Sequence, residues 1–394
     1  MATDWLAEND ILNSDQEALR DAVSDIAKKY DTQYWIDVDE AGRYPQEWVD
    51  ELTETGWMTM LVPEEYGGGG ASISDGALFL ETVNRWGGEA TAIHAQIYQM
   101  TTLLRHGTKE QKDTWLPQIA KGLRLQSFGI TEPDAGTDTT RIKTFAKREG
   151  DNYIVNGGKI FTSRFLQTDL MLLLVRTERY EDVQKKTDGI TVLLVDTREA
   201  KENGQIQARP IKVMDGHHTN ELTITNLVVP VENRIGDEGK GFRCILSGMN
   251  SERLLVASEY IGAGLWFIDK AVQYAKEREV FGRPIGMNQG IQFPLASSFS
   301  ELRAASLVRW EAARQYEAGK QPGFMSNNAK HLAGHAQWHA ANAAMDTFGG
   351  YGLANEYGIA QKFTQSRGRL TAPISTNIIL AGIAHRELGL PRSY

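Results

Sequence analysis

Residues 126–138 read QSFGITEPDAGTD, and this stretch decides the fold of the 394-residue chain more than any other. A short apolar, strand-like segment runs into a turn made of Pro, Gly and small hydroxyl residues. Such a turn presents backbone N–H groups and short hydroxyl side chains to one point, which suits a bound anion or the edge of a ring. The stretch therefore predicts a ligand-binding loop after a strand, although a plain connecting turn can have the same composition.

Three further segments of the sequence allow this turn to be interpreted. Residues 249–255 read MNSERLL, residues 278–285 read REVFGRPI and residues 348–352 read FGGYG. In this order and at these intervals, the four segments resemble the acyl-CoA dehydrogenase family of flavoproteins. The resemblance covers nearly the whole chain, and the combination is specific where each motif alone is not.

Periodicity independently predicts an α+β protein with a β-block between two helical regions. Residues 15–121 show helical spacing, as in 16–27, where one face carries Leu19, Ala22, Val23 and Ile26. Short β-rich runs follow at 171–175, 190–195 and 222–225. From residue 239 the spacing is helical again, so the order of elements is not the βαβ alternation of a Rossmann fold.

Two local features refine this organisation. Asn156-Gly157-Gly158 predicts a hairpin turn between two strands. The resemblance implies an N-terminal α-helical domain (1–124), a middle β-domain (125–236) and a C-terminal four-helix-bundle domain (237–394).

Composition limits the class of partner and compartment. The chain has 42 Lys and Arg against 51 Asp and Glu, so its net charge is −9. This acidity argues against general nucleic-acid binding, which requires neutralisation of phosphates. No apolar run approaches the roughly 18 residues of a membrane span, and residues 1–10 lack a signal or transit pattern. The sequence therefore predicts a cytoplasmic protein that binds neither nucleic acid nor membrane.

Metal-binding residues are sparse. Cys244 is the single cysteine, which excludes a disulfide within the chain and a multi-cysteine metal site, and it is expected to be a small buried hydrophobic residue. His217 and His218 are adjacent, and neighbours on a strand point to opposite faces. We expect no metal site.

Glu252 is the candidate catalytic residue. It lies beside an apolar helix face, where a carboxylate has a raised pKa and becomes a usable base near neutral pH. The resemblance implies a glutamate that removes the α-proton of an acyl thioester. Most relatives carry this residue in a loop near the C-terminus, where this chain has Pro373; a subset that includes isovaleryl-type and long-chain-type enzymes carries it on the helix, as Glu252 does. A solvent-exposed helix glutamate is the alternative interpretation.

Neighbouring residues complete the implied substrate site. Arg253 is expected near the thioester and Ser375 at the loop that polarises its carbonyl. Because Pro373 has no N–H, the donor would be Ile374, Ser375 or a flavin hydroxyl. Tyr98 matches a helix that closes the acyl pocket, so its ring predicts a short, branched or cyclic acyl group.

Glu259 lies two turns after Glu252 on the same helix face. Coupling to the base is one interpretation of this spacing. Pairing on the surface is the other, and the sequence favours it.

The resemblance also implies an FAD site. The residues that would surround the isoalloxazine ring and the pyrophosphate are Phe128, Ile130, Thr131, Gly136, Thr137, Phe161 and Ser163. Those that would bind the FAD of a neighbouring subunit are Arg278, Phe281, Gln289, Asp346, Gly349 and Gly350. Phe161 and Ser163 replace the Trp and Thr that are common in relatives, and Asp346 stands where relatives often have Gln. A site shared by two chains implies a homo-oligomer, expected to be a tetramer.

The implied reaction is the FAD-dependent α,β-dehydrogenation of an acyl-CoA to the trans-2-enoyl-CoA, with an electron-transfer flavoprotein as electron acceptor. A flavin-dependent monooxygenase on the same fold is the alternative, although such relatives usually lack a glutamate at either position. An acyl-CoA oxidase or an enoyl-CoA reductase is also compatible with these residues. A non-catalytic flavoprotein is a further alternative from a different class.

Overall fold

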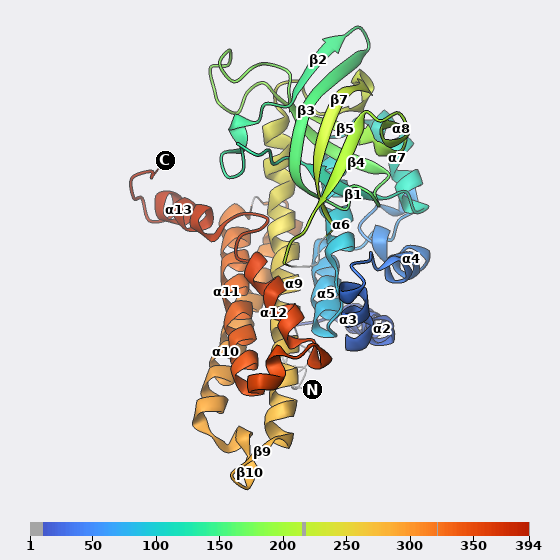
Figure 1. Cartoon of the computed structure of the whole chain (residues 1–394). Coiled ribbons are helices and arrows are strands. Elements are labelled where there is room, and N and C mark those ends of the chain that lie inside the picture. Colours follow the sequence, from blue (N-terminus) through green and yellow to red (C-terminus); the bar gives the residue numbers. More distant parts are fainter. Residues whose placement is uncertain (1–10, 215–217, 321, 394) are drawn as a thin grey trace.

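The computed structural model describes residues 11–214, 218–320 and 322–393. Figure 1 shows a sheet at one end of the molecule and long helices that run from it to the other end. Residues 1–10 and His217, on which two sequence expectations rest, lie outside the described residues.

The N-terminal region is helical. Its helices are α2 (Ser14–Lys29), α3 (Thr32–Glu40), α4 (Gln46–Glu54), α5 (Ile73–Arg85), α6 (Thr91–His106) and α7 (Lys109–Ala120). The predicted first helix is confirmed. Asn13 caps it in a capping box, in which the side chain of Asn13 accepts the backbone N–H of Gln16 and the side chain of Gln16 accepts the backbone N–H of Asn13. Val23 is buried on its inner face, as the spacing predicts.

The middle region forms a mixed sheet with strand order β6-β7-β3-β2-β4-β5-β8, and β1 pairs in parallel with β4. The strands are β1 (Leu125–Gly129), β2 (Phe145–Glu149), β3 (Asn152–Ser163), β4 (Leu170–Arg176), β5 (Ile190–Asp196), β6 (Ile206–Ile211), β7 (Thr219–Pro230) and β8 (Arg234–Ile235), with α8 (Thr197–Glu202) after β5. The three β-rich runs seen in the sequence lie on β4, β5 and β7. Strand β4 is buried along its whole length.

The predicted hairpin turn at residues 156–158 is wrong. These residues continue β3, which pairs with β7 through a bulge between Val155 and Gly157. Gly157 has a φ of 151°, and a Cβ there would lie 2.6 Å from Thr144 Oγ1. The glycine therefore serves a close approach of two strands. The chain reverses instead at Gly150, between β2 and β3.

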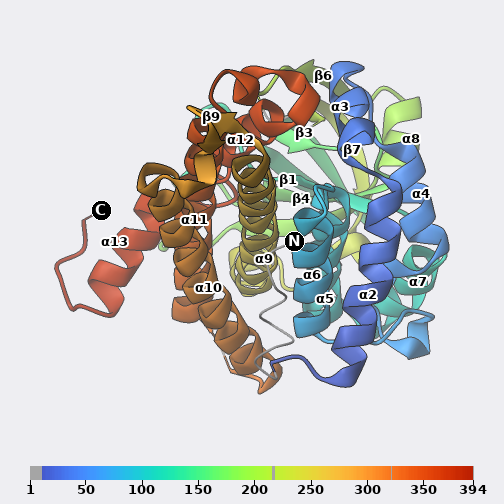
Figure 2. The same ribbon diagram turned by 90° about the horizontal axis from the view of Figure 1, so that it is seen from below.

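The C-terminal region is a helix bundle, as expected. It contains α9 (Gly241–Glu277), β9 (Glu279–Val280), β10 (Arg283–Pro284), α10 (Gln289–Glu317), α11 (Gly323–Phe348), α12 (Ile359–Gly368) and α13 (Thr376–Arg386). Figure 2 shows α9 between α10 and α11 on one side and α5 and α6 on the other. A buried alanine face on α11 lets it pack closely against α9. Helix α9 thus contacts all parts that form the site.

Two contacts fix α9 and α10 to the N-terminal helices. Gly262 of α9 lies so close to α5 that a Cβ there would be 2.1 Å from the carbonyl oxygen of Glu81. Arg309 of α10 and Glu81 of α5 form a fully buried ion pair. Removing either partner would leave a buried charge without its counter-charge.

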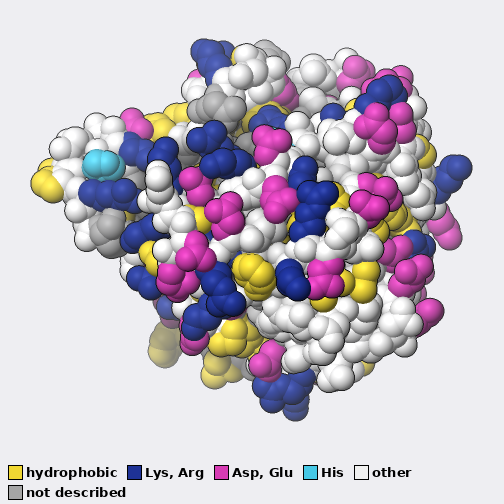
Figure 3. Space-filling view, turned by 90° about the horizontal axis from the view of Figure 1, so that it is seen from above, with side chains coloured by type: hydrophobic (Ala, Val, Ile, Leu, Met, Phe, Trp, Pro, Cys, Tyr) yellow, Lys and Arg dark blue, Asp and Glu magenta, His cyan; other side chains and the backbone are white. Residues whose placement is uncertain are grey.

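Among the residues that the structure describes, no helix is both long and apolar enough to cross a membrane. Figure 3 shows basic and acidic side chains interspersed on the face seen from above. Cys244 is buried, as expected.

Candidate active site

A cavity of about 240 Å³ lies where α6, the strands β1 and β3, and α9 meet. The loop after α12 closes it. The residues that line the cavity come from α6 (Thr91, His94, Tyr98), the strands and the residue after β3 (Phe128, Phe161, Ser163, Arg164), α9 (Glu252, Val256, Glu259, Tyr260), and the end of α12 with the loop after it (Gly368, Arg369, Ala372, Pro373). Seven residues singled out in the sequence therefore meet in one place, namely Tyr98, Phe128, Phe161, Ser163, Glu252, Glu259 and Pro373.

Glu252 is buried, with 6% of its surface exposed. Burial raises its pKa to about 7, against the opposing effect of the cations Arg253 and Lys330. A carboxyl group with this pKa can accept a proton near neutral pH. The interpretation of Glu252 as a solvent-exposed helix glutamate is contradicted by its burial.

Glu259 is also buried, at 3% exposed, so the expectation that it pairs on the surface is wrong. The spacing on α9 placed it correctly on the face of Glu252, but sequence spacing does not reveal what packs against that face. Its Oε1 atom lies 3.4 Å from Nδ1 of His94 on α6. Burial raises the pKa of Glu259 to about 7, although Arg369 and Arg164 act to lower it.

Lys330 of α11 was not foreseen as a site residue. Its Nζ donates a hydrogen bond of 2.9 Å to the carbonyl oxygen of Ile374, and burial lowers its pKa to about 8. The hydroxyl of Tyr260 donates to the carbonyl oxygen of Ala372 at 3.0 Å. These two bonds hold the loop that carries Pro373 against the cavity. The feature of the sequence that could have identified Lys330 is a charged residue within an apolar, alanine-rich helix.

Two predicted substrate residues do not line the cavity. Arg253 is buried next to Glu252, and its Nη1 donates to Oδ1 of Asn250 at 3.3 Å. The hydroxyl of Ser375 accepts the backbone N–H of Ile378 at 3.4 Å and so caps helix α13. Their roles toward a substrate stay predictions.

A buried ion pair organises the turn after β1. Nζ of Lys159 lies 2.8 Å from Oε1 of Glu132, and both side chains are buried. Glu132 also accepts the backbone N–H groups of Lys143 and Thr144. The backbone N–H of Ile160 donates to the carbonyl oxygen of Thr131 at 2.8 Å. The turn is therefore fixed against β3 by contacts that the motif alone did not show.

The residues at the mouth of the cavity fit a flavin. Phe161 has a φ of 56°, which is unfavourable for a non-glycine residue, and yet 58% of its surface is exposed. An aromatic ring held in this way presents an open face for stacking. Ser163 shares a hydrogen bond with Thr219 at 2.9 Å. Gly136 and Thr137 are exposed after β1, and open space surrounds the Cα of Gly136, so a phosphate has room to approach.

The second set of predicted flavin residues lies at the far end of α9. Arg278, Phe281, Asp346, Gly349 and Gly350 line one cavity of about 870 Å³ near β9 and β10. Gln289 follows the lining residue Asn288 in sequence, but it does not line the cavity itself. Phe281 is fully exposed.

The two flavin-type surfaces are well separated within one chain. Glu252 lies on α9, and Arg278 follows the last residue of this helix, 26 positions later. At 1.5 Å per residue, the two are roughly 40 Å apart along the helix axis. Figure 1 shows β9 and β10 at the opposite end of the molecule from the sheet. A single chain therefore does not bring the two sets of residues to one ligand.

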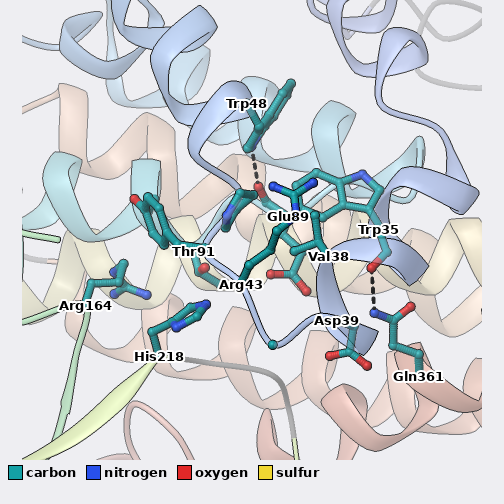
Figure 4. A pocket seen from close by; sticks show the side chains of 14 residues that line it. Trp35, Val38, Asp39, Arg43, Trp48, Glu89, Thr91, Arg164, His218 and Gln361 are labelled. Carbon is teal, nitrogen blue, oxygen red and sulfur yellow. Dashed lines mark hydrogen bonds between the residues drawn. The ribbon is translucent and has the colours of Figure 1, made fainter. Parts of the chain in front are cut away.

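A smaller cavity of about 60 Å³ adjoins the Glu252 cavity, because Thr91 and Arg164 line both. Figure 4 shows Arg164 and His218 on one side of it and Asp39 and Gln361 on another. Glu89 lies between them, and its carbonyl oxygen accepts a hydrogen bond of 2.9 Å from Nε1 of Trp48. The walls of this second cavity combine aromatic and aliphatic side chains with several charged ones.

Three family models match the chain in sequence. They describe the N-terminal, middle and C-terminal domains of acyl-CoA dehydrogenase and match residues 13–123, 127–227 and 239–385. This chain belongs to the acyl-CoA dehydrogenase family. The acyl-CoA dehydrogenase FadE12 of Mycobacterium tuberculosis is 32% identical over 387 residues, which cover 98% of each chain.

Solved structures agree with this assignment. Butyryl-CoA dehydrogenase from Megasphaera elsdenii matches with a TM-score of 0.89 and 27% identity, over 96% of this chain and 99% of that chain. Glutaryl-CoA dehydrogenase in its glutaryl-CoA complex matches with a TM-score of 0.89 and 28% identity, over 97% of each chain. As a member of the acyl-CoA dehydrogenase family, the protein is an FAD-dependent oxidoreductase that acts on CH–CH bonds.

Proposed function

We propose that the protein converts an acyl-CoA with a short, branched or cyclic acyl group into the trans-2-enoyl-CoA, with Glu252 as the catalytic base. The observation that carries this proposal is the burial of Glu252 in the same cavity as Phe128, Phe161 and Ser163. A base and a flavin-binding surface on two sides of one cavity suit the removal of two hydrogens from adjacent carbons.

The reaction breaks one C–H bond at the α-carbon and one at the β-carbon and forms a C=C bond. Glu252 accepts the α-hydrogen as a proton at its carboxylate. FAD, when bound, accepts the β-hydrogen with its electron pair. Phe161 would stack on the flavin ring, Thr131 and Ser163 would donate to its edge, and Thr137 would reach a phosphate oxygen.

The loop after α12 brings the thioester to the base. Lys330 and Tyr260 hold the loop through Ile374 and Ala372. Arg253 lies beside Glu252, and its charge supports ionisation of the base. Because Glu252 is buried, these charges act on it more strongly than they would in solution.

The size of the acyl group follows from Tyr98. Its ring contributes to the cavity wall opposite α9 and packs 5.9 Å from the ring of Phe128. We expect Tyr98→Gly to accept longer acyl chains. An unchanged chain-length profile would argue against a role for this ring.

The same proposal extends to partners. The separation of the two flavin-type surfaces supports a homo-oligomer, proposed to be a tetramer, in which Arg278 and Phe281 of one chain complete the FAD site of another. We further propose that an electron-transfer flavoprotein accepts the electrons, and that the protein is cytoplasmic.

Anaerobic flavin reduction tests the reaction and the base together. The purified FAD-bound protein is mixed with short, branched, cyclic and aromatic acyl-CoAs, and the flavin absorbance is followed in wild type, Glu252→Gln and Glu202→Gln. Glu202 is an exposed glutamate on α8 and serves as the matched control. We expect at least one acyl-CoA to bleach the wild type and the control but not Glu252→Gln.

Bleaching that persists in Glu252→Gln would place the base elsewhere. No bleaching by any acyl-CoA, despite bound FAD, would refute the dehydrogenase proposal. Oxygen consumption with externally supplied reduced flavin would then favour the monooxygenase alternative.

A further inference from the structure

The part of the active-site cavity beyond Glu252 is polar. Glu259 lies seven residues after Glu252 on α9, about 10 Å further along the axis. Its Oε1 atom is buried and receives no hydrogen bond from the residues that the structure describes; the nitrogen Nδ1 of His94 lies 3.4 Å away, in ion-pair range. A buried acceptor in this state is costly unless a bound molecule donates to it.

A donor without a partner lines the same cavity. Nη1 of Arg369 is buried and also has no hydrogen-bond partner among the described residues. The guanidinium group of Arg369 lies over the ring of Tyr260, 5.4 Å from its centroid, which holds it in place. Arg369 and Glu259 interact electrostatically, so acceptor and donor belong to one region of the cavity.

The adjoining cavity adds further charged groups among aromatic and aliphatic side chains. Arg164 lines both cavities, and Asp39, Glu89 and His218 line the smaller one (Figure 4). A pocket built for a hydrocarbon tail is lined mainly by apolar side chains. The wall past Val256 therefore differs from what an unsubstituted acyl chain requires.

We propose that the acyl group of the substrate carries a hydroxyl group at its distal end, which donates a hydrogen bond to Glu259 and accepts one from Arg369. This inference rests on the proposed dehydrogenation and names its substrate class. A hydroxyl group is both donor and acceptor, so one group satisfies both buried atoms.

Two other substrate classes fit less well. A hydrocarbon end would leave Glu259 Oε1 and Arg369 Nη1 desolvated and without partners. A carboxylate end would bring a third carboxyl group into a cavity that already holds Glu252 and Glu259. Arg164 and Arg369 act on Glu259, and Arg253 and Lys330 act on Glu252, so both carboxyl groups already have cationic neighbours.

Matched acyl-CoA substrates test the inference on the FAD-bound enzyme. The first set is cyclohexane-1-carbonyl-CoA, its 4-hydroxy derivative and its 4-carboxy derivative; the second is pentanoyl-CoA and 5-hydroxypentanoyl-CoA. The kcat/KM for flavin reduction is measured for each. We expect the hydroxylated member of at least one set to exceed its unsubstituted partner by about 10- to 100-fold, as a lost hydrogen bond to a charged group implies.

Variants assign this preference to the two side chains. Glu259→Leu and Arg369→Met should each bring the ratio of hydroxylated to unsubstituted substrate toward one, whereas Glu202→Gln should keep it. Two variants on different elements, α9 and the end of α12, protect the test against a folding defect in either one.

The outcomes separate this inference from the proposed function. Flavin reduction with equal or higher kcat/KM for the unsubstituted or carboxylated substrates would overturn the hydroxyl assignment and leave the dehydrogenase intact. A hydroxyl preference that survives in both variants would overturn the assignment to Glu259 and Arg369. No flavin reduction by any acyl-CoA would overturn both proposals.

Discussion

Compared with wild type, the Glu252→Gln variant should become more stable as the pH rises from acid to alkaline values. Glutamine has nearly the same shape as glutamate but cannot ionise. Burial raises the pKa of Glu252 from 4.5 to about 7, so the folded chain binds this proton more tightly than the unfolded chain does. Stability contributed by the group is therefore lost as pH rises between these two values.

The magnitude follows from the shift. Each pKa unit corresponds to about 1.4 kcal/mol, so the raised pKa of Glu252 lowers the free energy of unfolding by about 3 kcal/mol at pH 8 and by about 1 kcal/mol at pH 5. The free energy of unfolding of Glu252→Gln minus that of wild type should thus rise by roughly 2 kcal/mol from pH 5 to pH 8. For a chain of 394 residues this corresponds to a change in Tm of about 2–3 °C.

The assay is thermal unfolding of the FAD-bound protein at both pH values, with wild type, Glu252→Gln and Glu202→Gln measured side by side. Taking the difference between variants at each pH removes every contribution that the substitution leaves constant, including altered packing. The exposed Glu202 should give no pH-dependent difference. A Glu252→Gln difference that is the same at pH 5 and pH 8 would show that the pKa of Glu252 is not raised, and would remove the physical basis for its role as base.

Three other predictions concern the groups that support the site. Lys159→Met should destabilise the protein by about 3–5 kcal/mol, because it leaves Glu132 buried without its counter-charge; urea unfolding of Lys159→Met and of the double variant with Glu132→Gln should show partial recovery in the double variant. Lys330→Met should slow flavin reduction and move the rise of its rate to higher pH, because the cation of Lys330 lowers the pKa of Glu252 and its Nζ holds Ile374; a pH–rate profile identical to wild type would contradict this. Phe281→Ala should leave the secondary structure unchanged but weaken FAD retention and subunit association, measured by absorbance and light scattering during gel filtration, because this exposed ring contacts little in its own chain.

The order of elements was predictable because each segment carries its own period. Short continuous apolar runs mark β4 and β5, and apolar spacing marks α2 and the long α9. The hairpin at residues 156–158 failed for a tertiary reason. Gly157 is needed for the approach of Thr144, the residue before β2, and the same Asn-Gly-Gly composition would serve a turn.

The site was predictable only where a motif is continuous in sequence. Glu252 and Phe161 follow from such motifs, and the structure places both in one cavity. Arg369 comes to this cavity from the end of α12, and Lys330 of α11 holds the neighbouring loop through Ile374. Their contribution depends on helix packing and on the path of the loop at Ala372, which no local pattern encodes.

Helix α9 carries both the proposed base and the group proposed to bind the distal end of the acyl chain. One face of this helix carries Glu252 and, two turns later, Glu259, and both are buried against α6 and the loop after α12. Because the helix is rigid, the distance between the base and the second carboxyl group is fixed, and a substrate must place its α-carbon and its distal group at matching positions. A hydroxylated acyl group would then be held at both ends, which aligns the α-hydrogen with Glu252 better than the thioester contacts alone. This reasoning implies that loss of Glu259 should lower kcat as well as raise KM for a hydroxylated substrate, because binding energy far from the reacting carbons contributes to alignment in the transition state.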